Sequence, residues 1–258
     1  MAELAFVGLG LGDERGLSRE ALDVLRECGA ILAEEYTAVA PAGTLDRLAA
    51  ELGRPIRRLG RSELESEIPV REALQHHARV ALLVVGDPFT ATTHVALRLG
   101  VERAGHTWRY LPNASILTAA AGYLGLSAYR FGRTVSLPFP APGFEPRSPL
   151  EHLAANRARG LHTLVLLDLV PDEARYLGAA EALALLRARD PDGAILPDSA
   201  EVAVVARVSR PDADAWVGTF AALRRIEFGP PLHTIVVPAA ELHFQESEAL
   251  ARYRRAPR

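Results

Sequence analysis

Strand-like apolar runs alternate with amphipathic helical segments along most of this chain, and that alternation limits the folds open to it. Helical segments such as 18–26 and 45–52 lie between apolar runs at residues 4–8, 30–33, 80–85 and 107–111. Ser62 and Glu65 have the spacing of a capping box that opens a further helix. Strands joined by helices pair in parallel, with helices on both faces of the sheet. We therefore expect an α/β fold with mainly parallel or mixed sheets.

The second half of the chain has a different sequence pattern. After Asn113 comes a helix of small residues over 115–126, and a series of prolines predicts an extended loop over 137–149. Three expected strands and then a closing helix occupy, in that order, residues 161–167, 202–208, 231–237 and 241–254. A chain of 258 residues is long enough for two domains of medium size. We expect an N-terminal α/β domain over residues 1–112 and a C-terminal α/β domain over residues 113–258.

Composition argues against several classes of protein. The net charge of −3 gives no sign of binding to nucleic acid or to a membrane surface. All basic residues are arginines, so neither a phosphate-binding P-loop lysine nor a Schiff-base lysine is available. Cys28 is the single cysteine and the eight histidines lack metal-ligand spacing, so we expect no disulfide and no metal. No apolar run approaches the ~20 residues that span a bilayer, and we expect a cytoplasmic protein.

A glycine-rich turn over residues 8–16 follows the first expected strand. Its alternating glycines allow a ligand to approach the backbone closely. The dinucleotide fingerprint G-x-G-x-x-G is incomplete, because its third glycine position holds Asp13 or Arg15, depending on where the count starts. Glu34 and Glu35 nevertheless stand where a ribose-binding acid is found. A nicotinamide-dependent oxidoreductase is therefore one alternative.

The segment "GDPFTATTH" follows the buried strand at 80–85. Pro88 biases Asp87 away from helical conformation, so the carboxylate is held on a turn at the carboxyl end of a strand. That edge is where open α/β sheets bind ligands. His94, at the start of the next helix, is interpreted as structural and not as catalytic.

Several motifs taken together carry a resemblance to a known family. They are, in chain order, "FVGLGLGDERGLS", "AEEYT", "GDPFTATTH", "NASILTAAAGYLGLSAYRFG", "RGLHTLVLLDL", "VARV" and "FGPPLHTIVVP". This set resembles the diphthine synthases, which belong to the tetrapyrrole-methylase-like superfamily of S-adenosylmethionine-dependent methyltransferases. The resemblance covers essentially the whole chain, and the long middle motifs are its most specific part.

The resemblance implies two α/β domains with S-adenosylmethionine in the cleft between them, and a homodimer. It implies a protein substrate, elongation factor 2, at a histidine that already carries an aminocarboxypropyl group. Methyl groups pass to the amine of that group and produce the trimethylammonium of diphthine. Carried over position by position, the cofactor contacts of the family fall on Leu11, Asp87, Thr90, Ser115, Ile116, Leu167, Val208 and His233.

The chemistry implied by the resemblance places modest demands on side chains. An α-amino group titrates near pH ~8, so part of it is neutral and nucleophilic without a strong base. We therefore expect catalysis by positioning and name no catalytic side chain. Two further alternatives stay open. A corrin or sirohaem-precursor methyltransferase of the same superfamily would be expected to have proline in place of Leu11. A non-catalytic nucleoside-binding protein could keep the same pocket.

Overall fold

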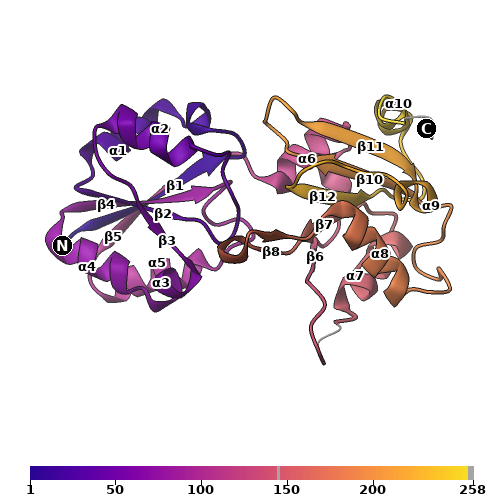
Figure 1. Ribbon diagram of the computed structural model, residues 1–258, viewed down its shortest axis with the longest axis horizontal. Helices are drawn as coiled ribbons and strands as arrows, with labels where there is room; N and C mark the ends of the chain where they lie inside the picture. Colours follow the sequence, from indigo (N-terminus) through magenta and orange to yellow (C-terminus); the bar gives the residue numbers. More distant parts are fainter. Residues whose placement is uncertain (144–145, 255–258) are drawn as a thin grey trace. The chain divides into compact units, whose positions relative to one another are not determined.

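The computed structural model describes residues 1–143 and 146–254, and its contacts divide the chain into two compact units (Figure 1). The first unit is Met1–Ile116 together with Val170–Ala174, and the second is Leu117–Leu169 together with the chain from Arg175. The sequence did not indicate the return of Val170–Ala174 to the first unit. The domain boundary expected between residues 112 and 113 stays a prediction. Within the described residues, no helix is long and apolar enough to cross a bilayer.

The first unit is built on a five-stranded sheet in the order β3-β2-β4-β1-β5. In that order the strands are Arg57–Leu59, Ala30–Glu34, Arg79–Val85, Glu3–Gly10 and Thr107–Leu111. All four neighbouring pairs are parallel. The parallel sheet expected from the alternation of strands and helices is therefore confirmed.

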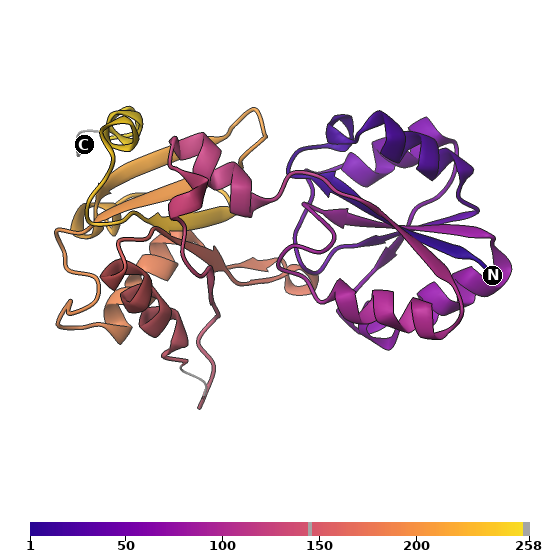
Figure 2. The same cartoon turned by 180° about the vertical axis from the view of Figure 1, so that it is seen from behind.

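Helices cover both faces of this sheet (Figures 1 and 2). Side chains alternate between the faces of a strand, so Ala5, Val7 and Leu9 of β1 lie in one apolar cluster, and Leu4 and Phe6 lie in the other. The first cluster includes residues of α1 (Arg19–Glu27) and α2 (Thr44–Leu52). The second cluster includes residues of α3 (Arg61–Ser66), α4 (Ile68–His76) and α5 (His94–Arg103).

The connections create a switch point between β1 and β4. From β1 the chain passes through α1 on one face, whereas from β4 it passes through α5 on the other. Because β1 and β4 are neighbours, the connections that leave their carboxyl ends turn toward opposite faces of the sheet. Such a point is where open α/β sheets form a ligand-binding crevice. The glycine turn and the "GDP" turn both lie there.

Local signals explain where several helices begin and end. The Ser18 hydroxyl accepts a hydrogen bond from the Ala21 N–H at 3.0 Å and caps α1. The expected capping box at Ser62 and Glu65 is wrong. α3 begins one residue before Ser62, and the Glu63 carboxylate accepts from the Gly60 N–H at 3.2 Å. The spacing of three residues was right, but the expected pair lies two residues too late in the sequence.

The second unit contains a mixed five-stranded sheet in the order β11-β10-β12-β7-β6. In that order the strands are Asp214–Thr219, Glu201–Ala206, His233–Val237, Thr163–Leu167 and Val135–Leu137. Only β6 and β7 pair in parallel among these neighbours. A separate two-stranded ribbon joins β8 (Leu169–Val170) to β9 (Arg175–Tyr176).

In the described part of the chain, five α-helices accompany the second sheet. They are α6 (Ile116–Leu124), α7 (Ser148–Ala158), α8 (Ala179–Arg189), α9 (Phe220–Leu223) and α10 (Phe244–Ala251). The sequence patterns did not indicate α7, α8 or β11. The expected loop over 137–149 extends too far, because α7 begins at Ser148 with Pro149 in its first turn, a position that proline tolerates. Residues 144 and 145 of that loop lie outside the described residues.

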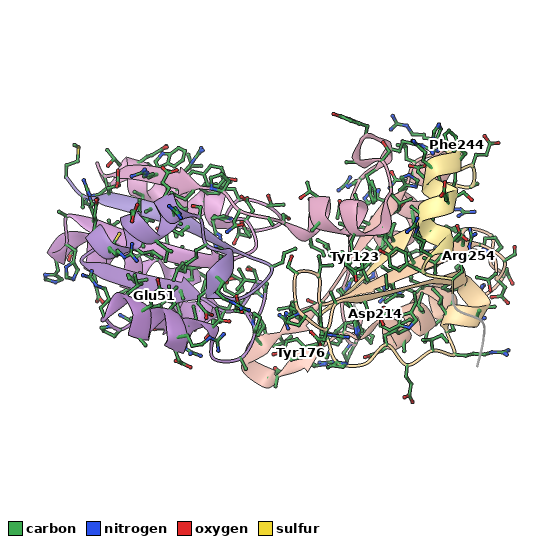
Figure 3. The ribbon with its side chains drawn as sticks, turned by 90° about the horizontal axis from the view of Figure 1, so that it is seen from above. Glu51, Tyr123, Tyr176, Asp214, Phe244 and Arg254 are labelled. Atoms are coloured by element: carbon green, nitrogen blue, oxygen red, sulfur yellow. The ribbon has the colours of Figure 1, made fainter. Side chains whose placement is uncertain are left out.

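A buried ionic cluster attaches α10, which begins at Phe244 (Figure 3), to the rest of the second unit. The Glu246 carboxylate accepts hydrogen bonds from the Ser127 N–H and the His243 N–H, each at 3.0 Å. His162 Nε2 lies 3.0 Å from the same carboxylate, and the Arg130 guanidinium also donates to it. His162 Nδ1 accepts from a backbone N–H, so Nε2 carries the proton of a neutral ring. Glu246 is therefore the single charged acceptor on which these donors converge.

Candidate active site

Two turns at the carboxyl ends of β1 and β4 are hydrogen-bonded to each other. The Gly10 N–H donates to the Gly86 carbonyl at 3.1 Å, and the Gly86 N–H donates to the Gly10 carbonyl at 2.8 Å. Both glycines have left-handed backbone angles, with φ of +74° and +80°. Only glycine adopts this conformation without steric cost, which explains the residue type at both places. The paired glycines are buried and join the two turns to each other at the switch point.

Gly8 is required for a different reason. A Cβ at this position would lie 2.7 Å from Asn113 Cβ and 2.8 Å from the Gly86 carbonyl oxygen. Such contacts are too short for carbon, so a larger residue would push the three segments apart. The glycine turn, the "GDP" turn and the loop that contains Asn113 are thus in close packing contact.

The Asp87 carboxylate is buried and fully engaged by hydrogen bonds. Oδ1 accepts from the Phe89 N–H at 3.0 Å and from the Thr90 hydroxyl at 2.8 Å. Oδ2 accepts from the Tyr110 hydroxyl at 2.5 Å and from the Asn113 N–H at 3.4 Å. Burial acts to raise the pKa of Asp87, but these hydrogen bonds outweigh burial and hold the pKa below its ordinary value. The carboxylate therefore shapes the turn.

Removing the Tyr110 hydroxyl tests this role of Asp87. In Tyr110→Phe the carboxylate loses its shortest hydrogen bond, so the pKa of Asp87 should rise toward its ordinary value. A hydrogen bond to a charged group contributes about 1.5–3 kcal/mol, and we expect the free energy of unfolding at pH 7 to fall by about that amount. Urea denaturation measures the change. Tyr129→Phe is the control, because the Tyr129 side chain is 99% exposed and its hydroxyl can remain hydrated. Equal effects of the two substitutions would contradict the prediction.

The "ATTH" segment holds the turn from its other side. His94 Nδ1 lies 2.8 Å from the Pro88 carbonyl oxygen, and the Thr92 hydroxyl donates to the same oxygen at 2.6 Å. Because a carbonyl only accepts, the proton of His94 is on Nδ1. Thr93 Oγ1 lies 3.1 Å from the hydroxyl of Tyr36, which belongs to the "AEEYT" motif. These bonds support the structural interpretation of His94.

The predicted cofactor residues of the second unit lie at one edge of its sheet. Leu167 is the last residue of β7 and His233 the first of β12, and these neighbouring strands are antiparallel. His233 also pairs with Ala206, the last residue of β10, and Val208 follows two residues later. On either side of Val208 the backbone is left-handed, at Arg207 and at residue 209. Strained non-glycine residues of this kind cluster at ligand sites.

The imidazole of His233 is held by a backbone group and keeps one donor free. Nδ1 accepts a hydrogen bond from the N–H of Ala179, the first residue of α8, at 3.2 Å. Nε2 is buried and has no hydrogen-bond partner among the described residues. Burial, and then the positive charge of Arg207, lower the pKa of His233, so the ring is neutral at pH 7 with its proton on Nε2. The backbone groups of Phe228 and Pro230 act more weakly in the opposite direction on this pKa.

The structure thus distributes the eight predicted cofactor residues between the two units. The first unit contains Leu11, Asp87, Thr90, Ser115 and Ile116, and the second contains Leu167, Val208 and His233. Within each unit these residues lie at one edge of the sheet.

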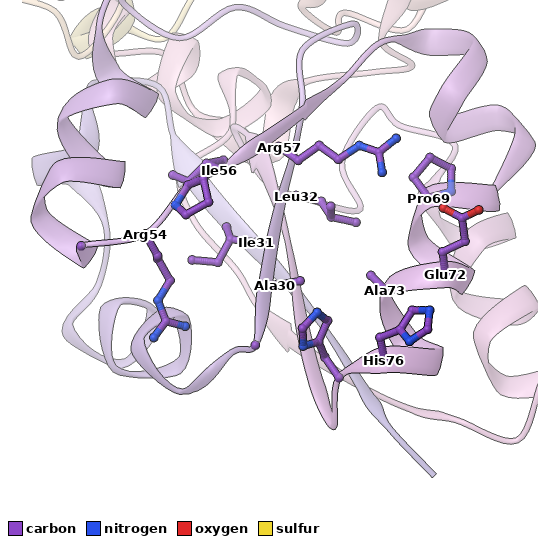
Figure 4. Close-up of a pocket in the computed structure, with 14 residues that line it drawn as sticks. Ala30, Ile31, Leu32, Arg54, Ile56, Arg57, Pro69, Glu72, Ala73 and His76 are labelled. Carbon is purple, nitrogen blue, oxygen red and sulfur yellow. The ribbon is translucent and has the colours of Figure 1, made fainter.

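A pocket of about 670 Å³ in the first unit lies elsewhere (Figure 4). Its lining includes Gly29 and Ala30 at the amino end of β2, His77 just before β4, and the side chains of Arg54 and Arg57. The pocket contains none of the predicted cofactor residues. It opens at the amino ends of β2 and β4, away from the switch point, and we do not assign the site to it.

Comparison with known proteins agrees with the motifs. The family model described as Tetrapyrrole (Corrin/Porphyrin) Methylases matches residues 3–224. A protein from Methanothermobacter thermautotrophicus named diphthine synthase is 40% identical, covering 99% of this chain and 97% of its own length. One of the same name from Haloquadratum walsbyi is also 40% identical, covering 98% of this chain and 96% of its own.

A solved structure gives the same result at the level of the fold. A crystal structure of diphthine synthase has a TM-score of 0.89 and 33% identity, with 99% of this chain and 97% of that chain covered. The family model, the relatives and the fold agree over nearly the full length. The chain belongs to the tetrapyrrole (corrin/porphyrin) methylase family and, within that family, to the diphthine synthases.

Proposed function

We propose that this protein transfers methyl groups from S-adenosylmethionine to the amino group of the aminocarboxypropyl-histidine of elongation factor 2. The observation that carries the proposal is the full-length similarity to proteins named diphthine synthase. The glycine and "GDP" turns at the switch point support it, since they form a ligand-binding edge in the first unit. The corrin and nucleoside-binding alternatives explain the turns but not the similarity to diphthine synthases.

The residues that would hold S-adenosylmethionine are the eight predicted ones. Main-chain groups around Leu11, Asp87 and Thr90 are suited to its polar parts, because the Asp87 carboxylate is already occupied. The apolar side chains of Ile116 and Leu167 can pack against an adenine ring. When bound, S-adenosylmethionine supplies an electrophilic methyl group on a sulfonium.

We propose that the protein contributes positioning and not acid–base catalysis. Both oxygens of Asp87 are occupied, and those of Asp168 accept from the N–H groups of Phe139 and Leu169, each at 3.0 Å. The lowered pKa of Asp87 makes that carboxylate a poor base at pH 7. Part of an amine with a pKa near ~8 is neutral at pH 7. Alignment of the reacting groups can contribute several kcal/mol, up to roughly ten.

The decisive experiment compares two preparations of elongation factor 2 as acceptors of labelled methyl groups. One preparation carries the aminocarboxypropyl group on its histidine, and the other carries unmodified histidine. We expect label only in the first, and mass spectrometry of the modified peptide then counts the methyl groups. Binding of S-adenosylmethionine without transfer to either preparation would favour the corrin or sirohaem-precursor alternative. Absence of binding would refute the methyltransferase proposal.

We also propose that the enzyme is a homodimer that acts in the cytoplasm. The resemblance to the diphthine synthases supports the homodimer, and the nature of the substrate, a translation factor, supports the location. Light scattering should give about twice the 27.8 kDa mass of the chain. A mass equal to that of one chain would contradict the homodimer and leave the proposed reaction unaffected.

A further inference from the structure

We propose that Asn113 is a positioning residue that holds the predicted cofactor-binding segments of the first unit in their working arrangement. The inference rests on the proposed function, since the segments matter only if they bind S-adenosylmethionine. Asn113 is not among the eight predicted contacts, and the motif analysis singled out its neighbours Ser115 and Ile116. Its own role is visible in the hydrogen bonds of its side chain and main chain.

The side-chain amide connects Asn113 to both ends of the glycine turn. Nδ2 donates to the Gly8 carbonyl at 2.9 Å and to the Gly16 carbonyl at 3.1 Å. Leu11, the predicted contact, lies between these two anchor points. One NH₂ group therefore fixes the beginning and the end of the turn that carries Leu11. A primary amide can do this because its nitrogen has two donors.

The remaining groups of Asn113 connect the other segments. The Asn113 N–H donates to Asp87 Oδ2 at 3.4 Å, and Asn113 Oδ1 accepts from the Ala114 N–H at 2.8 Å. The first bond reaches the turn that carries Thr90. The second orients the backbone that leads directly into Ser115. All three segments of the first unit with predicted cofactor contacts thus meet at one residue, through its side chain and its main-chain N–H.

Close packing makes asparagine difficult to replace. A Cβ on Gly8 would lie 2.7 Å from Asn113 Cβ, and a Cβ on Gly10 would lie 3.0 Å from Asn113 Oδ1. Aspartate has nearly the same shape, but it has no donor for the carbonyls of Gly8 and Gly16. It would also place a second negative charge beside Asp87. Asn113→Asp therefore removes the positioning bonds without opening a cavity.

The test measures the affinity for S-adenosylmethionine by calorimetry in wild type, Asn113→Asp and Asn113→Ala. We expect Kd to rise at least tenfold in both variants, with kcat at saturating S-adenosylmethionine changed by less than about threefold. A loss of this kind corresponds to about 1.4 kcal/mol or more. Amide hydrogen exchange of residues 8–16 should be faster in both variants without any ligand, which is independent of catalysis.

Asn156→Asp is the matched control for a purely structural loss. Asn156 makes a similar set of bonds in the second unit, with Nδ2 donating to the Arg133 carbonyl at 2.9 Å and to the Thr163 hydroxyl at 3.0 Å. This variant should lose stability while its folded form keeps the wild-type Kd and the wild-type exchange of residues 8–16. If the wild type binds S-adenosylmethionine and Asn113→Asp binds it with the same Kd, this inference is wrong and the proposed function is unaffected. Failure of the wild type to bind S-adenosylmethionine would overturn the proposed function, and this inference with it.

Discussion

Gly8→Ala is expected to reduce the affinity for S-adenosylmethionine at least a hundredfold and to abolish measurable methyl transfer at ordinary cofactor concentrations. The new Cβ would lie 2.7 Å from Asn113 Cβ and 2.8 Å from the Gly86 carbonyl oxygen, both of which are held by neighbouring segments. The segments must therefore separate by several tenths of an ångström or more. Misplacement of about 1 Å at a binding site can cost a factor of about a hundred. Overpacking should also lower the free energy of unfolding by about 1–3 kcal/mol.

Gly16→Ala is the control for this prediction because it lies in the same turn. A Cβ at Gly16 would meet only the Leu9 carbonyl oxygen at 3.5 Å, which is ordinary van der Waals contact. The carbonyl that accepts from Asn113 is retained. We expect Gly16→Ala to bind and turn over like wild type. Calorimetry and methyl incorporation on the same preparations measure both effects, and comparable losses in the two variants would contradict the steric argument.

The contrast between Gly8 and Asn113 shows how far the sequence leads into the site. Alternating glycines after a buried strand indicate a close backbone approach, because glycine alone tolerates it. The pattern does not show whether a ligand or another segment of the protein approaches the glycine backbone. The group that approaches Gly8 belongs to the protein itself. It is Asn113, which lies 105 residues away along the chain. Such a contact exists only after β1, β4 and β5 have paired.

The position of Asp87 could be predicted from the sequence, but its burial and its hydrogen bonds could not. A carboxylate on a turn after a buried strand was expected at the carboxyl edge of the sheet, and the structure places it there. Its donors include Tyr110 and Asn113, which are more than twenty residues further along. Without them, the sequence suggests an exposed carboxylate facing a cation. The structure shows a buried one whose charge is already satisfied.

The second unit was the less predictable half of the fold, for physical reasons. In α8, apolar residues do not form one clear stripe, so its helical period is weak in the sequence. In α7, a proline in the first turn and the proline-rich segment before it resemble a continuing loop. β11 contains Gly218 and has a polar residue at each end, and its place depends on antiparallel pairing with β10. The first unit had stronger signals because its three central parallel strands, β1, β2 and β4, are mainly apolar runs.

The pH dependence of stability should be governed largely by Glu246, and Glu246→Gln should remove much of it. Burial acts to raise the pKa of Glu246, but hydrogen bonds from the Ser127 and His243 N–H groups and from His162 prevail and lower it to about 2. The ordinary value is 4.5. A lowered carboxyl pKa stabilises the folded state fully above the ordinary value, and the contribution is lost as pH falls from there toward the folded value. The shift corresponds to about 3 kcal/mol.

At pH 7 we therefore expect Glu246→Gln to lower the free energy of unfolding by about 3 kcal/mol, since the neutral amide accepts these bonds less well and leaves Arg130 without its buried partner. Between pH 4.5 and pH 2 the wild type should lose about 3 kcal/mol more stability than the variant, so the two converge. Glu248→Gln is the control, because Glu248 lies in the same helix but is exposed. Urea denaturation at several pH values measures all three proteins. If the free energies of unfolding of wild type and Glu246→Gln fall in parallel as the pH is lowered, the prediction is wrong. Other carboxyl groups would then govern the acid response, and the pKa of Glu246 would be the same in the folded and unfolded chain.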